Sequence, residues 1–412
     1  MQSKIKDIFK WLHPGIGIKR WIGLSTFGVV LVVIGSARLQ AEEFWVVKTL
    51  DLIIVISGII ILILSIKSMI RSFITAFMPS SRGTELVDIL YQRRQLGRGP
   101  KVVTIGGGTG LSVLLTGLKE YTSNITAIVT VADDGGSSGR LRQEFDILPP
   151  GDIRNCLVAL SDSPALMRDL FQFRFDKSSE LSWHSFGNLF ITVMTRLTGD
   201  FEKAIKETSK VLALRGQVIP STLNNVVLTA KHKDGSVTEG ENNIPKARLP
   251  IDRVSLKPAG SPATPEALKA IEEARIIVLG PGSLYTSIVP NLLIKEISDA
   301  IAASNAIKVY VCNIMTQPGE TDGLNASDHV KTLITHAHPK VIDYCIVNSG
   351  EIPNDTLKRY QQQNSYPVVN DRKNIESIGY RVIEEDAVVV DDVARHDPQK
   401  LAKIIMGLIE EI

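Results

Sequence analysis

The sequence predicts an α/β domain with a doubly wound, mainly parallel sheet and a small β-rich insertion, preceded by a transmembrane helical hairpin. Two apolar stretches near the N-terminus predict the hairpin, and continuous apolar runs that alternate with helical patterns from residue 101 onward predict the sheet. Glycine-rich segments directly after several of these runs indicate loops at one edge of that sheet. A chain of 412 residues is long enough for a large core and an accessory segment.

Residues 1–78 are predicted to form the hairpin, with spans at about residues 21–38 and 47–66. The first span includes WIGLSTFGVVLVVIGSA, which has no charge and would extend about 26 Å as a helix, near the lower limit for crossing a bilayer. The second includes LIIVISGIIILILSI and spans comfortably only with the five residues before Asp51, which place Lys48 near the interface. A late start and the lack of a cleavage-like site argue against a signal peptide. We favour insertion over two buried core helices, because so short a hairpin offers no partner surface.

Lysine and arginine are concentrated outside the two spans. Five precede the first span and five follow the second before residue 95, whereas the loop between the spans carries Arg38 and Lys48 beside Glu42 and Glu43. The positive-inside bias predicts that both ends of the hairpin lie in the cytoplasm. The main domain is therefore expected to be cytoplasmic and attached to the cell membrane.

The composition argues against some classes of function. The net charge is only +2, so nothing favours nucleic acid as a partner. The three cysteines, Cys156, Cys312 and Cys345, are not spaced as metal ligands, and an odd number of cysteines does not suit a disulfide framework. We therefore expect a reducing compartment and buried thiols.

Residues 79–100 are predicted to be a basic linker helix beginning at Thr84, and residues 101–412 the α/β domain. Short apolar runs alternate with helical sequence in this domain, which is typical of strands covered on both faces. The runs are KVVTI, ITAIVTVA, ARIIVLG, AIKVYVCNI and VIDYCIVNS. At about residues 225–258, strand-like runs flank the turn signal Asp234-Gly235 and predict the β-rich insertion.

The segment VVTIGGGTGLSVLLTGLK joins a predicted strand to a predicted helix through four glycines in five residues. It is not a P-loop, because no Lys-Ser/Thr follows at the required spacing, and it breaks the strict G-x-G-x-x-G fingerprint. The physical basis of both motifs remains, since glycines let the backbone approach a phosphate and a helix N-terminus attracts an anion. A purely steric turn rarely uses so many glycines. The candidate ligand-binding residues are Gly106, Gly107, Gly108, Thr109, Gly110 and Leu111.

A pair of aspartates follows the second predicted strand, in VADDGGSSGRLR. Asp133 and Asp134 lie a little over twenty residues past the glycine loop, where dinucleotide-binding folds place an acid against a ribose hydroxyl. They are equally suited to hold a divalent cation such as Mg²⁺ beside a diphosphate. A surface Asp-Gly turn is the third interpretation, and the position at the carboxyl end of a strand argues against it.

Further loops are expected at the same edge of the sheet. PPGDIRNC offers Arg154 to an anion, and HSFGNLFI places Asn188 before an apolar helix. VCNIMTQPGET supplies neutral hydrogen-bonding side chains, and no nucleophile with a histidine base is evident. VLGPGSLYTS is a second candidate anion-binding loop, with Gly280, Gly282 and Ser283. Together these loops predict a large phosphate-bearing ligand.

The motifs GGGTGLSVLL, VADDGGSSGRLR, LPPGDIRNCLVAL, FGNLFI, GPGSLYTSI and NIMTQPGET resemble the gluconeogenesis factor family, which is related to the 2-phospho-L-lactate transferases. The resemblance covers about residues 100–412, and the hairpin is similar to an N-terminal extension of some longer members. It implies a Rossmann-like, nucleotide-binding fold. Gluconeogenesis factors are associated with UDP-sugars and with cell shape and wall synthesis on gluconeogenic carbon. The transferases use a GDP-linked phospholactate, a deazaflavin acceptor and a divalent metal.

The resemblance also assigns site residues. Transferases tend to have a Gly-Asp-Asp form where this chain reads VADDGG, which favours the other branch and leaves a metal role of Asp133 or Asp134 in doubt. By motif, the phosphate loop carries over to residues 106–110, the acidic loop to Asp133 and Asp134, the GN asparagine to Asn188, and the second glycine loop to Gly280, Gly282 and Ser283.

Two C-terminal residues complete the candidate site: Tyr360 for stacking on uracil and Arg395 for a diphosphate or sugar, with ordinary surface as the alternative. The leading hypothesis is a membrane-tethered protein that binds UDP-N-acetylglucosamine or a similar nucleotide sugar without turnover and regulates cell shape and envelope synthesis under gluconeogenic growth. The alternative is a phospholactyl-type transferase acting from a GDP-linked donor onto a deazaflavin. An NAD-dependent oxidoreductase fits the fold class but not the broken fingerprint. An envelope-synthesis protein and a second copy of the chain stay open as partners.

Overall fold

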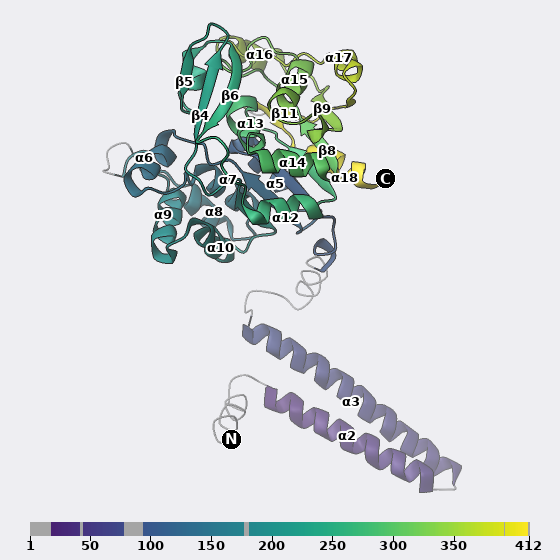
Figure 1. The fold of residues 1–412 in the computed structure, drawn as a ribbon. Helices are drawn as coiled ribbons and strands as arrows, with labels where there is room; N and C mark the ends of the chain where they lie inside the picture. Colours follow the sequence, from purple (N-terminus) through teal and green to yellow (C-terminus); the bar gives the residue numbers. More distant parts are fainter. Residues whose placement is uncertain (1–17, 42–43, 78–93, 177–180, 391, 411–412) are drawn as a thin grey trace. The chain divides into compact units, whose positions relative to one another are not determined.

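The computed structural model describes residues 18–41, 44–77, 94–176, 181–390 and 392–410 (Figure 1). The chain divides into two compact units, Met1–Arg94 and Gln95–Ile412. Most of the predicted linker helix, including its start at Thr84, falls outside the described residues.

The first unit is a helical hairpin of α2 (Ile18–Ala41) and α3 (Trp45–Phe77). A Cβ added to Gly58 of α3 would lie 2.8 Å from the carbonyl oxygen of Gly28 on α2, so these glycines let the backbones pack closely. Asp51 is buried in the seam and pairs with Arg38, with 3.2 Å between Oδ1 and Nε. Both helices are long and apolar enough to cross a membrane, and most of their side chains face outward. The predicted helical hairpin is confirmed, and its insertion into a membrane stays a prediction.

The second unit is built on a seven-stranded parallel sheet. Its strand order is β10-β9-β8-β7-β1-β2-β3, which confirms the doubly wound prediction. The direction of winding reverses between β1 and β7, and ligands of such sheets bind outside the carboxyl ends of the strands at this point. Every residue of β1, β2, β7 and β8 is buried, as their continuous apolar sequence predicts. The strands are β1 (Val102–Gly106), β2 (Ile125–Val129), β3 (Gln217–Pro220), β7 (Ile276–Leu279), β8 (Ile307–Val311), β9 (Tyr344–Asn348) and β10 (Arg381–Glu385).

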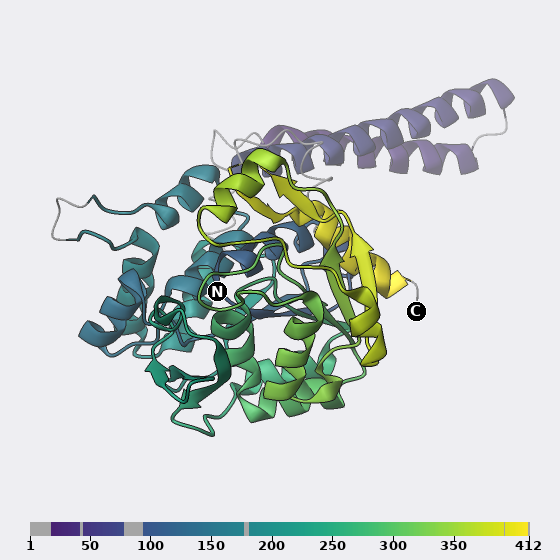
Figure 2. The same cartoon turned by 90° about the horizontal axis from the view of Figure 1, so that it is seen from above.

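Helices cover both faces of the sheet (Figures 1 and 2). The crossovers from β1 to β2 and from β7 to β8 run in opposite directions, so right-handed connections place α5 and α14 on opposite faces. Helix α5 packs against α7 and α18, and α14 packs against α12. The helices are α5 (Gly108–Leu118), α6 (Gly136–Phe145), α7 (Gly151–Leu160), α8 (Ala165–Gln172), α9 (Phe186–Thr198), α10 (Phe201–Val211), α12 (Pro265–Glu273), α14 (Lys295–Ala303), α15 (Ala326–His336), α16 (Asn354–Gln361), α17 (Arg372–Ser377) and α18 (Pro398–Glu410), with short turns η1 (Leu284–Ile288), α13 (Val289–Leu292) and η2 (Pro339–Val341).

The predicted β-rich insertion is a three-stranded antiparallel sheet in the order β5-β4-β6. It comprises β4 (Val227–His232), β5 (Val237–Glu239) and β6 (Ile251–Lys257), with the one-turn helix α11 (Ile244–Ala247) before β6. The turn between β4 and β5 falls at Asp234, whose carboxylate accepts from the Ser236 N–H at 2.9 Å. A separate two-stranded sheet, β11 (Val388–Val390) with β12 (Ala394–His396), precedes the last helix.

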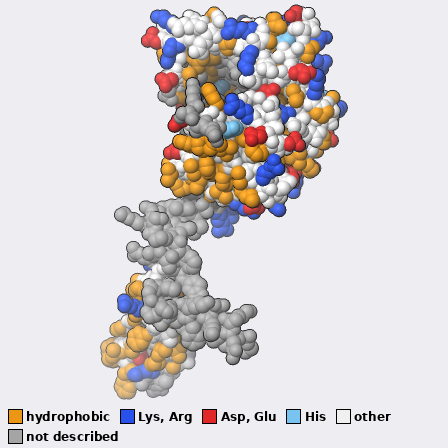
Figure 3. Space-filling view, turned by 90° about the vertical axis from the view of Figure 1, so that its left-hand side faces the viewer, with side chains coloured by type: hydrophobic (Ala, Val, Ile, Leu, Met, Phe, Trp, Pro, Cys, Tyr) orange, Lys and Arg blue, Asp and Glu red, His pale blue; other side chains and the backbone are white. Residues whose placement is uncertain are grey.

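Hydrophobic side chains gather on the outer face of α8 and α9 (Figure 3). Leu166 and Leu170 are one turn apart on α8, and Val193 and Leu197 are one turn apart on α9, so each pair protrudes on one side of its helix. Leu166 and Leu197 are 80% and 75% exposed. This face of the second unit therefore carries apolar side chains that the core does not use.

Candidate functional site

A cleft of about 560 Å³ opens at the point where the winding of the sheet reverses. It lies outside the carboxyl ends of β1, β7 and β8, the place where α/β sheets of this type bind ligands. Its walls are residues 107–110 after β1, residues 281–283 after β7, residues 313–318 after β8, Tyr360 of α16 and residues 393–396 around β12, together with Asp152 and Glu241.

The first glycine loop packs tightly against its neighbours. A Cβ on Gly110 would lie 2.6 Å from the carbonyl oxygen of Pro281, and one on Gly107 would clash with the Asp152 carboxylate. Gly108 has a φ of +67°, a conformation that glycine adopts without strain. Contacts within the protein therefore account for these glycines, and they bring the loops after β1 and β7 together.

The N-terminus of α5 faces the cleft. Gly107 precedes the helix and provides no side-chain cap, so the first turn has N–H groups without intrahelical acceptors. One of these, the Gly108 N–H, donates to the Asp152 carboxylate. The remaining N–H groups and the helix dipole favour an anion at this end of the cleft. Leu111 contributes only backbone here, because its side chain is fully buried in the core.

Neutral hydrogen-bonding side chains line the cleft beyond the second glycine loop. The Gln317 Nε2 donates to the Ser283 Oγ at 2.6 Å, and the Asn313 Nδ2 donates to the Gln317 Oε1 at 3.1 Å. This chain of bonds fixes the loop after β8 to the loop after β7. Gly280 and Gly106 lie at the ends of β7 and β1 and do not line the cleft, whereas Gly282 and Ser283 do.

The two C-terminal candidates, Tyr360 and Arg395, come together at the cleft although they lie on different elements. The Tyr360 Oη accepts from the Ala394 N–H at 3.0 Å, which fixes β12 beside α16. Arg395 follows directly and is exposed, and its guanidinium has no hydrogen bond or ion pair within the part of the chain that the structure describes. An aromatic ring and an unpaired cation are thus placed on the wall formed by α16 and β12.

Two acids of the cleft were not among the candidates from sequence. Burial, followed by the charge of Asp133, raises the pKa of Asp152 to about 7. Burial and the charges of Asp133 and Asp152 raise the pKa of Glu241, in the loop between β5 and α11, to about 9. Asp152 follows Gly151 at the start of a helix, a signal that the sequence did contain, whereas nothing in the sequence relates Glu241 to the cleft.

The predicted acidic pair supports this arrangement and does not line the cleft. The Asp133 side chain shares a hydrogen bond with Glu241, and the Asp134 Oδ1 accepts from the Asn242 N–H at 2.9 Å. Both aspartates therefore hold the loop that carries Glu241. In the described residues, no group of three or more His, Cys, Asp or Glu side chains is arranged to hold a metal ion.

Arg154 and Asn188 lie in a second, buried polar cluster outside the cleft. The Arg154 guanidinium donates to the Ser185 Oγ and to the Asn155 Oδ1, the latter at 2.7 Å. The Asn188 Nδ2 donates to the Ser137 Oγ at 3.0 Å. Burial, together with the charge of Arg174, lowers the pKa of Arg154 to about 10. The structure thus separates these two predicted residues from the glycine loops.

Comparison with known proteins agrees with this fold. A family model described as 2-phospho-L-lactate transferase CofD matches residues 102–388. The gluconeogenesis factor of Bacillus subtilis is 50% identical over 317 residues, which cover 77% of this chain and 100% of the relative. A crystal structure of a protein from Bacillus halodurans has a TM-score of 0.73 at 48% identity and covers 75% of this chain and 100% of that chain.

A further relative extends the match to the hairpin. A protein from Nostoc sp. that also has gluconeogenesis factor in its name is 46% identical over 424 residues, which cover 98% of this chain and 93% of the relative. The match to the Bacillus subtilis protein has about the length of the second unit alone. The chain therefore belongs to the 2-phospho-L-lactate transferase CofD family, among its members named gluconeogenesis factors.

Proposed function

We propose that this protein is a membrane-tethered regulator that binds a nucleotide sugar, UDP-N-acetylglucosamine or a close relative, and adjusts cell shape and envelope synthesis during gluconeogenic growth. The observation that carries the proposal is the meeting of the two glycine loops beside the N-terminus of α5, in a cleft that also presents Tyr360 and the unpaired Arg395. A diphosphate suits the helix N-terminus and the arginine, and a pyrimidine ring suits the tyrosine.

The regulatory role, without turnover, is supported by the lack of a nucleophile with a base among the described side chains that line the cleft, although the carboxyl groups of Asp152 and Glu241 are also present there. Asn313, Thr316, Gln317 and Ser283 are neutral, and no serine or cysteine beside a histidine base is placed there among the described residues. His396 lines the cleft, but burial lowers its pKa to about 4, so it is a poor base near neutral pH.

The first test is the loss of binding on replacement of the unpaired arginine. Arg395→Ala is expected to weaken binding of UDP-N-acetylglucosamine by about tenfold to a hundredfold, the effect of a lost charge-assisted hydrogen bond. Isothermal titration of the full-length protein in detergent measures it. The control is Arg275→Ala, an exposed arginine before β7 at the opposite edge of the sheet, which should bind as wild type does. Failure of the wild-type protein to bind any UDP-sugar, or its conversion of one, would overturn the proposal.

The membrane tether is tested by fractionation of cells. The full chain is expected in the membrane fraction, resistant to a high-salt wash, because its two apolar helices leave most of their side chains outward. A chain that begins at Gln95 is the control and should move to the soluble fraction. Recovery of the full chain as a soluble protein would contradict the tether.

The regulatory role requires, in addition, that a strain without the protein loses its shape on gluconeogenic carbon and regains it with the wild-type chain but not with Arg395→Ala.

A phospholactyl-type transferase is the second candidate, because the matching family model carries that description. The carboxyl groups of Asp152 and Glu241 stand beside the glycine loops, where an acceptor would be oriented. Preference for GDP over UDP in the same titration, above all with Mg²⁺ present, would favour this reading and send the search toward a deazaflavin acceptor.

A further inference from the structure

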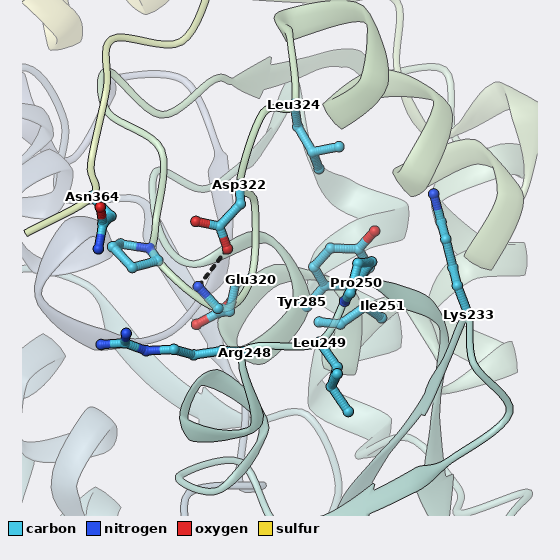
Figure 4. Close-up of a pocket in the computed structure, with 12 residues that line it drawn as sticks. Lys233, Arg248, Leu249, Pro250, Ile251, Tyr285, Glu320, Asp322, Leu324 and Asn364 are labelled. Atoms are coloured by element: carbon cyan, nitrogen blue, oxygen red, sulfur yellow. Dashed lines mark hydrogen bonds between the residues drawn. The ribbon is translucent and has the colours of Figure 1, made fainter. Parts of the chain in front are cut away.

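A second cavity, of about 310 Å³, lies between the β insertion and the loop after β8 (Figure 4). Six polar or aromatic side chains of its lining matter here: Lys233, Arg248, Tyr285, Glu320, Asp322 and Asn364. In Figure 4, Arg248 and Asn364 lie on one side of the Asp322 carboxyl group, and Tyr285 and Lys233 lie on the other. Neither the sequence motifs nor the site described above assigns a role to these side chains.

This cavity adjoins the nucleotide cleft. Pro318 lines both, and three segments place neighbouring residues in one and the other. In the segment after β7, Ser283 and Ser287 line the cleft and Tyr285 lines the cavity. In the loop after β8, Gln317 lines the cleft and Glu320 lines the cavity. After α16, Gln363 and Ser365 line the cleft and Asn364 lines the cavity. The cavity and the cleft therefore lie on the two sides of the same loops and share a wall at Pro318.

The polar groups of the cavity are incompletely used within the protein. Lys233, Arg248 and Asn364 are exposed to solvent, and their side chains make no hydrogen bond or ion pair to any residue that the structure describes. The exposed Asp322 carboxylate accepts from the Gly319 N–H at 2.6 Å. Glu320 accepts from the Thr286 hydroxyl only at 3.4 Å, and from the Tyr285 N–H. Two cations and two carboxyl groups thus surround one cavity without forming ion pairs with one another.

Two of these residues have left-handed backbone conformations, and Arg248 has its conformation as the C-cap of α11. Arg248 has a φ of +50° and Asn364 a φ of +58°, in the left-handed region that asparagine adopts readily and arginine seldom does. Such a conformation costs about 1–2 kcal/mol for a residue such as arginine and is found more often at ligand-binding positions. Arg248 follows α11, whose Pro245 packs against Gly319 of the loop after β8. This contact places the backbone of Arg248 beside the loop after β8, which lines both spaces.

We propose that this cavity is the sugar subsite of the nucleotide-sugar site, an inference that rests on the proposed function. Carboxyl groups accept hydrogen bonds from sugar hydroxyls, and Arg248, Lys233 and Asn364 donate to hydroxyl or acetamido oxygens. Tyr285, Leu249 and Ile251 present apolar surface to the C–H face of a pyranose ring. The diphosphate lies at the glycine loops, and the sugar extends past Pro318 into the cavity.

The test compares UDP with UDP-N-acetylglucosamine on the full-length protein in detergent. Arg248→Ala and Glu320→Gln are each expected to weaken binding of the nucleotide sugar about fivefold to tenfold, the effect of one lost hydrogen bond. The affinity for UDP should stay within about twofold of wild type, because the cavity does not contact the nucleotide. Arg253→Ala, an exposed arginine of β6 that does not line the cavity, is the matched control. Thermal melts confirm that each variant is folded.

The outcomes separate the two claims. Unchanged affinity of both variants for the nucleotide sugar, while Arg395→Ala still weakens both ligands, would overturn the subsite and leave the proposed function standing. Equal losses for UDP and for the nucleotide sugar in Arg248→Ala and Glu320→Gln would also overturn it, since these residues would then act on the nucleotide. A wild-type protein that binds neither ligand would overturn the proposed function and the subsite with it.

Discussion

Gly110→Val is expected to abolish detectable nucleotide-sugar binding and to lower the free energy of unfolding by about 3 kcal/mol, the upper range for overpacking a well-packed site. The added Cβ would lie 2.6 Å from the Pro281 carbonyl oxygen and 3.1 Å from the Gly282 nitrogen. Both are backbone atoms and cannot rotate away. The loops after β1 and β7 must therefore separate, and with them the first turn of α5 and the Ser283 hydroxyl.

The measurement is titration with UDP-N-acetylglucosamine beside a chemical unfolding curve. Gly407→Val is the matched control, because an added Cβ there meets no atom within 4 Å, so that only the somewhat higher helix propensity of valine relative to glycine acts. Circular dichroism at low temperature separates a folded protein without a site from an unfolded one. Wild-type affinity in Gly110→Val would show that the contact between the glycine loops does not shape the site.

The sequence was sufficient to predict the architecture of the second unit because its signals are local. Continuous apolar runs such as the one in β1 identify buried parallel strands, and Asp234-Gly235 identifies the hairpin of the insertion. The glycine loop was located by the same reasoning, although the crowding between Gly110 and Pro281 depends on a contact between distant segments that no local pattern shows.

The sequence predicts only part of the candidate site, and helix geometry explains why Asp152 was missed. The sequence pattern predicts Arg154 as the site residue of the segment that begins α7, but Asp152 two positions earlier faces the glycine loop. Residues two apart on a helix point about 200° apart, so both cannot face one cleft. Asp152 is the one in contact with the Gly108 N–H, and Arg154 instead meets Ser185 before α9. The sequence gives the helix but not its rotation about its axis.

The stability of the protein is expected to fall as the pH rises above about 4.5, and Glu241→Gln is expected to reduce this fall. A carboxyl group whose pKa is raised on folding binds more protons in the folded than in the unfolded state, so the free energy of unfolding decreases with pH between the two pKa values. For Glu241 this window extends to about 9, and for Asp152 and Glu320 it extends to about 7. Below about pH 3 the carboxyl groups are protonated in both states, and this contribution vanishes.

At pH 8, Glu241→Gln should therefore raise the free energy of unfolding by about 2 kcal/mol, less than the full shift in pKa implies because a glutamine amide replaces the hydrogen bond between Glu241 and Asp133 imperfectly. Urea unfolding at pH 5 and pH 8 measures the effect, which should be small at the lower pH. Glu272→Gln, on the exposed side of α12, is the control and should change neither value. If Glu241→Gln instead changed the free energy of unfolding equally at pH 5 and pH 8, or lowered it at pH 8, the result would show that folding does not raise the pKa of Glu241. Asp152, Glu241 and Glu320 would then be ionised near neutral pH. Their negative charges would repel the diphosphate that the glycine loops are proposed to bind.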